Sequence, residues 1–243
     1  MLPRLAASLI ALSFTAGAYA QPANQATTQP PTLKSQLDEL AAGFAQKAPA
    51  EMRAKFAQGI TDVRSLGLER SAKQVGDAAP QGELIDADGQ AVPFASLWAD
   101  GPVVVSFYRG GWCPYCNLQL RSLQASLSQI EGAGAKLVAV TPEQPQKAAE
   151  TTTKNDLAFQ VLSDNDNRLA KALGIAFTLP DAIRPIYQQR IGLAEYNGNE
   201  NDELPLAATY VIDASGVIRW AYLESDYKQR AEPSEILAAV EAL

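Results

Sequence analysis

The stretch that most restricts the fold of this chain lies between residues 103 and 130. Val103–Phe107 is a continuous apolar run, which is typical of a strand buried on both faces of a sheet. Gly110 and Gly111 follow, and apolar residues, mostly leucines, then recur at helical spacing as far as Ile130. A buried strand that turns sharply into an amphipathic helix predicts an α/β fold.

Later segments extend this pattern. Lys136–Val140 and Phe159–Ser163 are predicted to be further strands, with a polar helix between them. Thr209–Asp213 and Val217–Leu223 flank an Ala-Ser-Gly turn, which indicates a hairpin, and Pro233 begins a last helix. This order of elements predicts a central mixed β-sheet that is covered by helices on both faces.

The chain is predicted to consist of four parts. Residues 1–20 form a signal peptide, 21–32 a flexible linker, 33–72 an N-terminal helical extension, and 73–243 the α/β domain. The linker is predicted because its residues are polar, uncharged and rich in proline. The extension carries apolar residues at helical spacing, which suits either packing against the domain or an arm for a dimer or partner.

Residues 1–20 have the pattern of a secretory signal. Arg4 precedes an apolar stretch over residues 5–14, and Ala18 and Ala20 supply the small residues of a cleavage site. The apolar stretch is shorter than the roughly 20 residues that span a bilayer, so no stable membrane insertion is expected after the signal is removed. An uncleaved anchor is the alternative. We expect secretion across the inner membrane, and a periplasmic location if the source is a Gram-negative bacterium.

The composition excludes several classes of protein. The chain has no histidine, so an acid–base or metal site that uses imidazole cannot form. Its net charge of −7 and its lack of a run of Lys or Arg argue against a nucleic-acid partner and against docking to anionic lipid. Reactivity near neutral pH therefore rests on cysteine, lysine, a perturbed carboxylate or the substrate.

The two cysteines of the chain, Cys113 and Cys116, stand three residues apart at the predicted strand-to-helix turn. Residues at this spacing lie on one face of a helix and are close enough to form a disulfide. Cys113 would lie at the helix N-terminus, where free N–H groups favour a thiolate, and Pro114 suits the first helical position. Cys116 lies one turn further in and suits a resolving role. The pattern predicts a redox-active dithiol.

Other interpretations of the pair are weaker. A disulfide across so short a loop would stabilise the fold little. Two thiolates without histidine cannot complete a zinc site, so no metal is predicted, although a copper(I)-binding module remains an alternative. The Asp164-x-Asp166 sequence does not continue as a calcium loop, because Leu169 and Ile175 stand where that loop needs Gly and Glu.

One string carries a resemblance to a known family. Residues 107–116 read F-Y-R-G-G-W-C-P-Y-C, and later segments read L-S-D, A-E-Y-N-G and A-A-T-Y-V-I-D-A-S-G-V-I-R. Together they resemble the peroxiredoxin-like branch of the thioredoxin superfamily, the group of alkyl hydroperoxide reductases and thiol-specific antioxidants. The resemblance covers residues 33–243. It implies a thioredoxin-like fold and a site whose loop includes Tyr108, Arg109 and Trp112.

The resemblance implies a thiol peroxidase. Cys113 would take oxygen from a hydroperoxide and become a sulfenic acid, and Cys116 would condense with it to a disulfide. An external dithiol, such as a thioredoxin-like protein, would then reduce that disulfide, and no cofactor is implied. This chemistry needs an accessible Cys113 sulfur, framed by Trp112 and the loop 108–111, whereas an apolar lid favours an inert dithiol. The alternative function is a thioredoxin-like thiol–disulfide oxidoreductase that acts on protein disulfides.

Three positions depart from the related families. Peroxiredoxins carry Thr or Ser three residues before the attacking cysteine, where this chain has Gly110, and an arginine where it has Ala207. Thioredoxins carry a cis-proline at the latter position and a buried aspartate in place of Ser106. Arg109 could supply the missing positive charge, or it could be a solvated loop residue.

Overall fold

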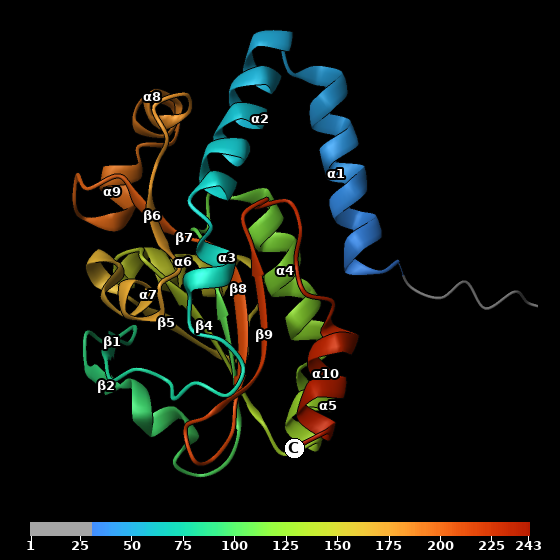
Figure 1. Cartoon of the computed structure of the whole chain (residues 1–243), viewed down its shortest axis with the longest axis vertical. Coiled ribbons are helices and arrows are strands. Elements are labelled where there is room, and N and C mark those ends of the chain that lie inside the picture. Colours follow the sequence, from blue (N-terminus) through green and yellow to red (C-terminus); the bar gives the residue numbers. More distant parts are fainter. Residues whose placement is uncertain (1–30) are drawn as a thin grey trace, which may run out of the picture. The chain divides into compact units, whose positions relative to one another are not determined.

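A mixed sheet of seven strands organises residues 31–243, which are the residues that this computed structural model describes (Figure 1). The predicted signal peptide, 1–20, and residues 21–30 of the predicted linker lie outside the described residues. In spatial order the strands are β2 (Ala91–Pro93), β1 (Glu83–Ile85), β5 (Gln160–Ser163), β4 (Lys136–Thr141), β3 (Val103–Phe107), β8 (Ala207–Ile212) and β9 (Ile218–Glu224).

The centre of the sheet is parallel and its edges are antiparallel. β3, β4 and β5 run parallel, and β8 lies antiparallel on the other side of β3. Val103 of β3 pairs with Lys136 of β4 and with Ile212 of β8. All five residues of β3 are buried, which explains why its sequence is apolar apart from Ser106 and does not alternate between apolar and polar residues. The prediction of a central mixed sheet is confirmed.

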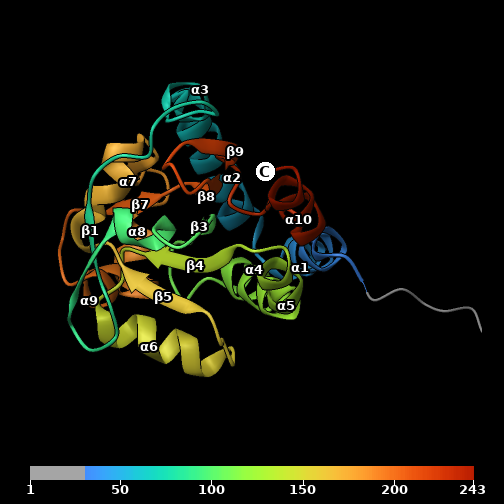
Figure 2. The same cartoon turned by 90° about the horizontal axis from the view of Figure 1, so that it is seen from below.

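Helices cover both faces of the sheet, as predicted. The helices and helical turns are α1 (Leu33–Lys47), α2 (Ala50–Ser65), α3 (Leu68–Ser71), α4 (Pro114–Ala125), α5 (Leu127–Gly132), α6 (Pro145–Lys154), α7 (Arg168–Leu173), α8 (Arg184–Ile186), α9 (Leu193–Asn197) and α10 (Pro233–Glu241), with 3₁₀ turns at Phe94–Trp98 and Asn165–Asn167 and a π-helical turn at Tyr187–Ile191. Figure 2 shows α1, α4, α5 and α10 gathered on one side of the sheet.

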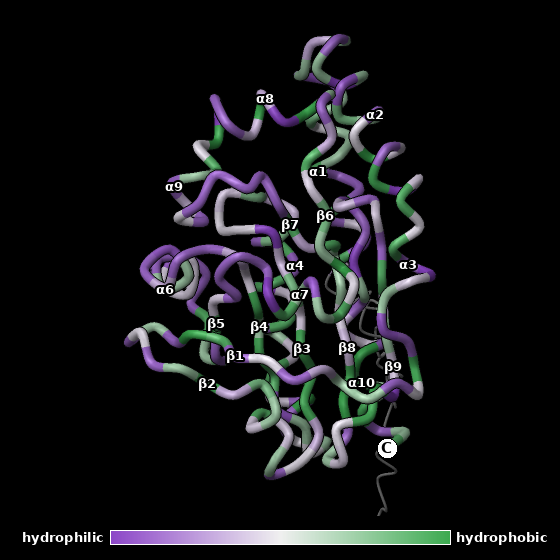
Figure 3. The backbone as a smooth tube through the Cα atoms, turned by 60° about the vertical axis from the view of Figure 1, so that its left-hand side comes forward, coloured by the Kyte–Doolittle hydropathy of each residue, from purple (hydrophilic) through white to green (hydrophobic). Residues whose placement is uncertain are grey.

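The two faces of the sheet have separate hydrophobic cores. One core lies under α1, α4, α5 and α10 and contains both cysteines, and Val104 of β3 points into it. Val103, Val105 and Phe107 point into the opposite core, which the 3₁₀ turn at Phe94–Trp98 and α7 cover. The hydrophobic colouring of β3 and β4 in Figure 3 follows from this double burial.

The predicted N-terminal helical pair is present as α1 and α2, and it packs against the sheet domain. Leu33 and Leu37 of α1 are buried in the core that contains the cysteines. The backbone N–H of Lys34 donates to the side chain of Glu232, just before α10, at 2.6 Å. The packing interpretation of this extension therefore holds for α1.

Two features differ from the sequence expectation. The leucine-striped segment forms two helices, because α4 ends at Ala125 and α5 begins at Leu127. The break at Ser126 leaves Leu123, Leu127 and Ile130 on one buried face, so the apolar pattern does not reveal it. In addition, β6 (Ala176–Thr178) and β7 (Glu203–Pro205) form a small second sheet beside α8 and α9.

Candidate active site

The dithiol lies in the turn that follows the central strand. β3 ends at Phe107, and α4 begins at Pro114 with Cys113 as its N-cap residue, as the sequence predicts. The N–H of Tyr108 donates to the carbonyl of Val140 at 2.9 Å, so the pairing of β3 with β4 continues one residue past the strand. The turn is therefore anchored in the middle of the sheet.

Steric contact with a neighbouring side chain explains why position 110 is a glycine. Its φ is +152°, and a Cβ atom there would stand 2.1 Å from Nε1 of Trp112. The Thr or Ser that peroxiredoxins carry at this position cannot be accommodated unless the indole moves. The departure at Gly110 is thus coupled to the placement of Trp112 beside the dithiol.

Polar side chains hold Gly111 from both sides. Its N–H donates to the buried Glu143 carboxylate at 3.0 Å, and its carbonyl accepts from Asn117 at 2.9 Å and from Lys154 at 3.2 Å. A Cβ atom at this position would stand 1.9 Å from the Thr151 hydroxyl of α6, so the turn lies tightly against that helix. Sequence reasoning missed Glu143, whose only signal is an acidic residue three positions after a predicted strand.

Both cysteines are free and buried, with Cys113 2% and Cys116 0% exposed. The expectation of an openly accessible Cys113 sulfur is wrong for this state of the protein. The loop between β9 and α10 lies over the site, where the ring of Tyr227 packs edge-on against Tyr115 at 5.5 Å between centroids. Pro114, by contrast, is exposed. Cys113 therefore lies directly beneath the surface.

Arg109 is buried, which contradicts its interpretation as a solvated loop residue. It is 3% exposed, and its guanidinium lies 4.3 Å from the ring centroid of Tyr227 and 5.2 Å from those of Trp112 and Tyr187. It donates a hydrogen bond to the Tyr187 hydroxyl. Within residues 31–243 it forms no ion pair with a carboxylate.

A second buried guanidinium reaches the dithiol from the C-terminal side. Arg230 is 6% exposed, and its Nη2 lies 3.4 Å from the sulfur of Cys116. Arg230 is likewise without a carboxylate ion pair in the described part of the chain. Sequence reasoning missed it, because Arg230 stands 114 residues from Cys116 and no local pattern connects the two.

The two thiols titrate as a coupled pair. Burial raises the pKa of Cys113, and the hydrogen bond between the two sulfurs raises it further. Burial also acts to raise the pKa of Cys116, but the hydrogen bond from Cys113 and the charges of Arg230 and Arg109 outweigh it and lower that pKa well below the usual range. The helix N-terminus alone predicts the thiolate at Cys113. The structure instead favours the thiolate at Cys116. Cys113 keeps the remaining proton and donates it in a hydrogen bond to the sulfur of Cys116.

The other two departures have ordinary packing partners. Ser106 is buried, and its hydroxyl accepts from Gln119 at 3.3 Å and lies 3.4 Å from that of Thr209. Ala207 is buried at the start of β8 and lines, together with Arg109, a small cavity of about 10 Å³. Arg109, which follows the neighbouring strand β3, thus borders the same space as Ala207.

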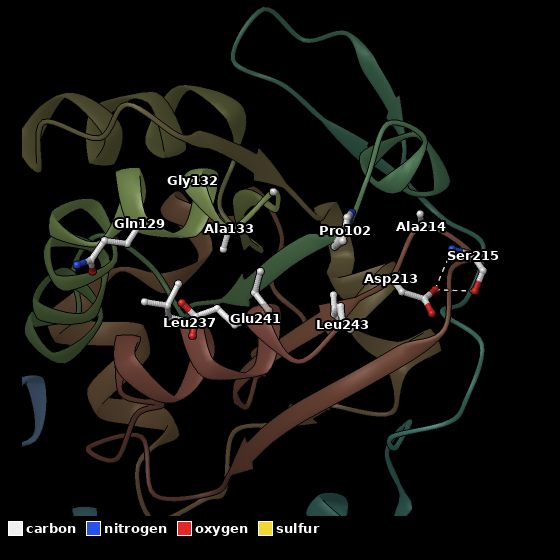
Figure 4. A pocket seen from close by; sticks show the side chains of 12 residues that line it. Pro102, Gln129, Gly132, Ala133, Asp213, Ala214, Ser215, Leu237, Glu241 and Leu243 are labelled. Carbon is white, nitrogen blue, oxygen red and sulfur yellow. Dashed lines mark hydrogen bonds between the residues drawn. The ribbon is translucent and has the colours of Figure 1, made fainter.

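Within residues 31–243, no group of three or more acidic or cysteine side chains is placed to hold a metal ion, and no helix is long and apolar enough to cross a membrane. A cavity of about 910 Å³ lies at the amino end of β3, between Pro102, Asp213 and Leu237 (Figure 4). The dithiol follows the carboxyl end of that strand, so this cavity does not belong to the dithiol site.

Comparison with known proteins identifies the family. The AhpC/TSA family matches residues 75–221, more than half of the chain. The chain belongs to the AhpC/TSA family. A chloroplastic peroxiredoxin Q from Oryza sativa subsp. japonica is 29% identical over 168 residues, which are 69% of this chain and 67% of the relative. Peroxiredoxin Bcp from Escherichia coli strain K12 is 28% identical over 102 residues, 42% of this chain and 65% of the relative.

Solved structures support the fold of this AhpC/TSA protein. Peroxidoxin BcpB from Mycobacterium tuberculosis has a TM-score of 0.55 at 20% identity, and the match covers 70% of this chain and 97% of that one. Reduced Prx3 from Vibrio vulnificus, in complex with hydrogen peroxide, has a TM-score of 0.57 at 19% identity, and the match covers 70% of this chain and 99% of that one. The predictions of a thioredoxin-like fold and of a peroxiredoxin-like enzyme are confirmed.

Glu143 should make the stability of the reduced protein depend on pH. Burial raises the pKa of this carboxyl from 4.5 to about 7, so between these values the native protein keeps a proton that the unfolded chain releases. The contribution of Glu143 to stability therefore falls, by up to about 3 kcal/mol, as the pH rises through this window. We expect Glu143→Gln to gain stability relative to wild type between about pH 5 and about pH 8 in urea unfolding.

Glu150→Gln on α6 is the matched control, because the side chain of Glu150 is 65% exposed. Its difference from wild type should be the same at both pH values. If Glu143→Gln also keeps a constant difference from wild type, the protonation assigned to Glu143 is wrong.

Proposed function

We propose that this protein is an exported thiol peroxidase that reduces hydroperoxides with the Cys113–Cys116 dithiol. The observation that carries the proposal is the charge around the two sulfurs. Two buried guanidiniums, those of Arg109 and Arg230, approach a dithiol that is itself buried, and neither forms an ion pair with a carboxylate in the described residues. A buried cation needs an anion nearby, and a thiolate supplies one.

The reaction uses each sulfur once. Cys113, the sulfur nearer the surface, attacks one oxygen of the hydroperoxide as a thiolate after its proton passes to Cys116 across their hydrogen bond. A sulfur–oxygen bond forms and the oxygen–oxygen bond breaks, and the leaving alkoxide or hydroxide takes the proton back from Cys116, which restores the Cys116 thiolate. Cys116 then attacks the sulfenic sulfur of Cys113, which forms the disulfide and releases hydroxide, and the hydroxide takes a proton from solvent to become water.

Arg109 is positioned to polarise the peroxide. Peroxiredoxins place an arginine at the position that Ala207 occupies here, and Arg109 lines the same small cavity as Ala207. Its guanidinium is held against three aromatic rings, so it is fixed before the substrate arrives. A donor of this kind stabilises the negative charge that develops on the leaving oxygen.

The burial of the dithiol favours a small substrate over a protein. Cys113 is 2% exposed beneath the loop that carries Tyr227, so a protein disulfide cannot reach its sulfur in this state. A hydroperoxide is small enough to enter through minor motions of this cover. We propose that the loop opens more widely only for the recycling step, in which an external dithiol protein reduces the Cys113–Cys116 disulfide.

Peroxide consumption by the reduced protein tests this function. We expect wild type to consume hydrogen peroxide with a dithiol reductant present, and Cys113→Ser to be at least about 100-fold slower, because the nucleophile is missing. Cys116→Ser should complete one turnover and stop as the Cys113 sulfenic acid. Wild-type activity no greater than that of Cys113→Ser would contradict the proposal, and insulin-disulfide reduction by the same sample would then favour the alternative of a thiol–disulfide oxidoreductase.

We propose export because residues 1–20 combine Arg4, an apolar stretch and the Ala18-x-Ala20 cleavage pattern. In a Gram-negative host the destination would be the periplasm, which is oxidising and in which a dithiol needs a dedicated reductant. Intact-mass analysis of protein recovered from outside the cytoplasm should give a chain that begins at Gln21. A mass that still includes residues 1–20 would contradict signal cleavage.

A further inference from the structure

Arg230 lies outside the part of the chain that matches the AhpC/TSA family, which ends at residue 221. It belongs to the loop between β9 and α10, and its Nη2 points at the sulfur of Cys116 at 3.4 Å. Its Nη1 donates to the carbonyls of Tyr227 and, at 2.8 Å, of Gln229. The guanidinium is therefore fixed by its own loop and directed at the sulfur.

The loop that carries Arg230 is fixed at both ends by the N-terminal helices. At its start, the N–H of Ser225 donates to the carboxylate of Glu69 in α3 at 3.1 Å, and the Ser225 hydroxyl also bonds to it. At its end, Glu232 accepts from the N–H of Lys34 in α1 at 2.6 Å. The helical extension thus holds Arg230 in place.

The charge of Arg230 has no carboxylate to balance it among the described residues. The three acids nearest to it in the sequence have other partners: Glu224 at the end of β9 pairs with Arg64 at 3.6 Å, Asp226 pairs with Lys228 at 3.5 Å, and Glu232 accepts from the N–H of Lys34 at 2.6 Å. The remaining acceptors of Arg230 are two neutral carbonyls and the sulfur. A buried guanidinium in this position is far better satisfied by a thiolate than by a thiol, which is a weak acceptor.

Several other groups act on Cys116, and they come from different elements. Arg109 supports its thiolate, and Cys113 donates a hydrogen bond to it. Three further groups disfavour a thiolate at Cys116 when they are themselves negatively charged. They are Tyr108 after β3, Glu143 after β4 and Tyr187 in the π-helical turn. Of the two cations, Arg230 is the one whose side chain bonds directly to the sulfur.

We propose that Arg230 is a catalytic residue that holds Cys116 as a thiolate and so accelerates closure of the Cys113–Cys116 disulfide. The inference rests on the proposed function, because disulfide closure follows the reduction of peroxide. In the step that Arg230 assists, the Cys116 thiolate attacks the sulfur of the Cys113 sulfenic acid. The sulfur–sulfur bond forms, the sulfur–oxygen bond breaks, and the departing hydroxide takes up a proton to become water.

The first test measures ionisation without any peroxide. In a Cys113→Ser background, Cys116 is the sole thiol of the chain, and the serine hydroxyl can still donate to it. The ¹³Cβ chemical shift of labelled Cys116 then reports its titration. We expect the midpoint to rise by at least about one pH unit when Arg230→Met is added, and by less with Arg230→Lys, which keeps the charge.

The second test follows a single turnover. After one equivalent of hydrogen peroxide, dimedone trapping and mass analysis report how long the Cys113 sulfenic acid survives. We expect Arg230→Met to form the sulfenic acid and then to close the disulfide about tenfold more slowly than wild type at neutral pH, and to recover as the pH is raised. Lys228→Met is the matched control, because it removes a positive charge from the same loop, and it should close as fast as wild type.

The outcomes separate the two proposals. An unchanged Cys116 midpoint in folded Arg230→Met protein overturns the role of Arg230. Should that variant not fold, Arg230→Lys decides the matter. A Cys116 midpoint raised by a smaller amount, with closure slowed to match, supports the role of Arg230, whereas a midpoint and a closure rate identical to those with Arg230 overturn it. A shifted midpoint in a protein that never consumes peroxide would overturn the peroxidase function and leave the Arg230–Cys116 interaction standing.

Discussion

The site depends on two buried positive charges and one shared negative charge. Arg109 and Arg230 are both nearly inaccessible to solvent, and both lie against the dithiol. Burying a guanidinium without an anion is costly, and the described residues offer neither one a carboxylate ion pair. A dithiol that has lost one proton satisfies this requirement, so the redox chemistry and the stability of the site have the same electrostatic origin.

Several parts of the chain converge to build this arrangement. The central strand β3 and helix α4 supply Arg109 and the two cysteines, and the segment between β6 and β7 supplies the Tyr187 ring and hydroxyl. The loop after β9 supplies Tyr227 and Arg230, and helices α1 and α3 bond to the two ends of that loop. The helical extension and the C-terminal segment, which the family match does not cover, therefore complete the site.

Local features of the sequence were predictable because their causes are local. The apolar run of β3, the start of α4 at Pro114 and the position of Cys113 at the turn all follow from periodicity and backbone rules. The thioredoxin-like fold followed from the resemblance. Gly110 was recognised as a departure, but its cause, the indole of Trp112, is visible only in three dimensions.

Long-range features could not be predicted. Tyr227, in a loop more than a hundred residues away, packs against the core that contains Cys113, and Arg230 in the same loop joins the hydrogen bond from Cys113 in favouring a thiolate at Cys116. The charge of Arg109 was considered, but its burial among aromatic rings depends on the folding of distant segments. Glu143 had only a weak local signal, an acid after a strand, and its contact with Gly111 requires the register of β3 and β4.

The most direct test of the shared charge is the ultraviolet absorbance of thiolate, near 240 nm, in the reduced wild-type protein as the pH is varied. The account predicts that one thiolate per chain is already present at about pH 7 and that the second appears only well above the usual range for a cysteine. A protein that shows no thiolate until about pH 8.5, followed by two together, would contradict it.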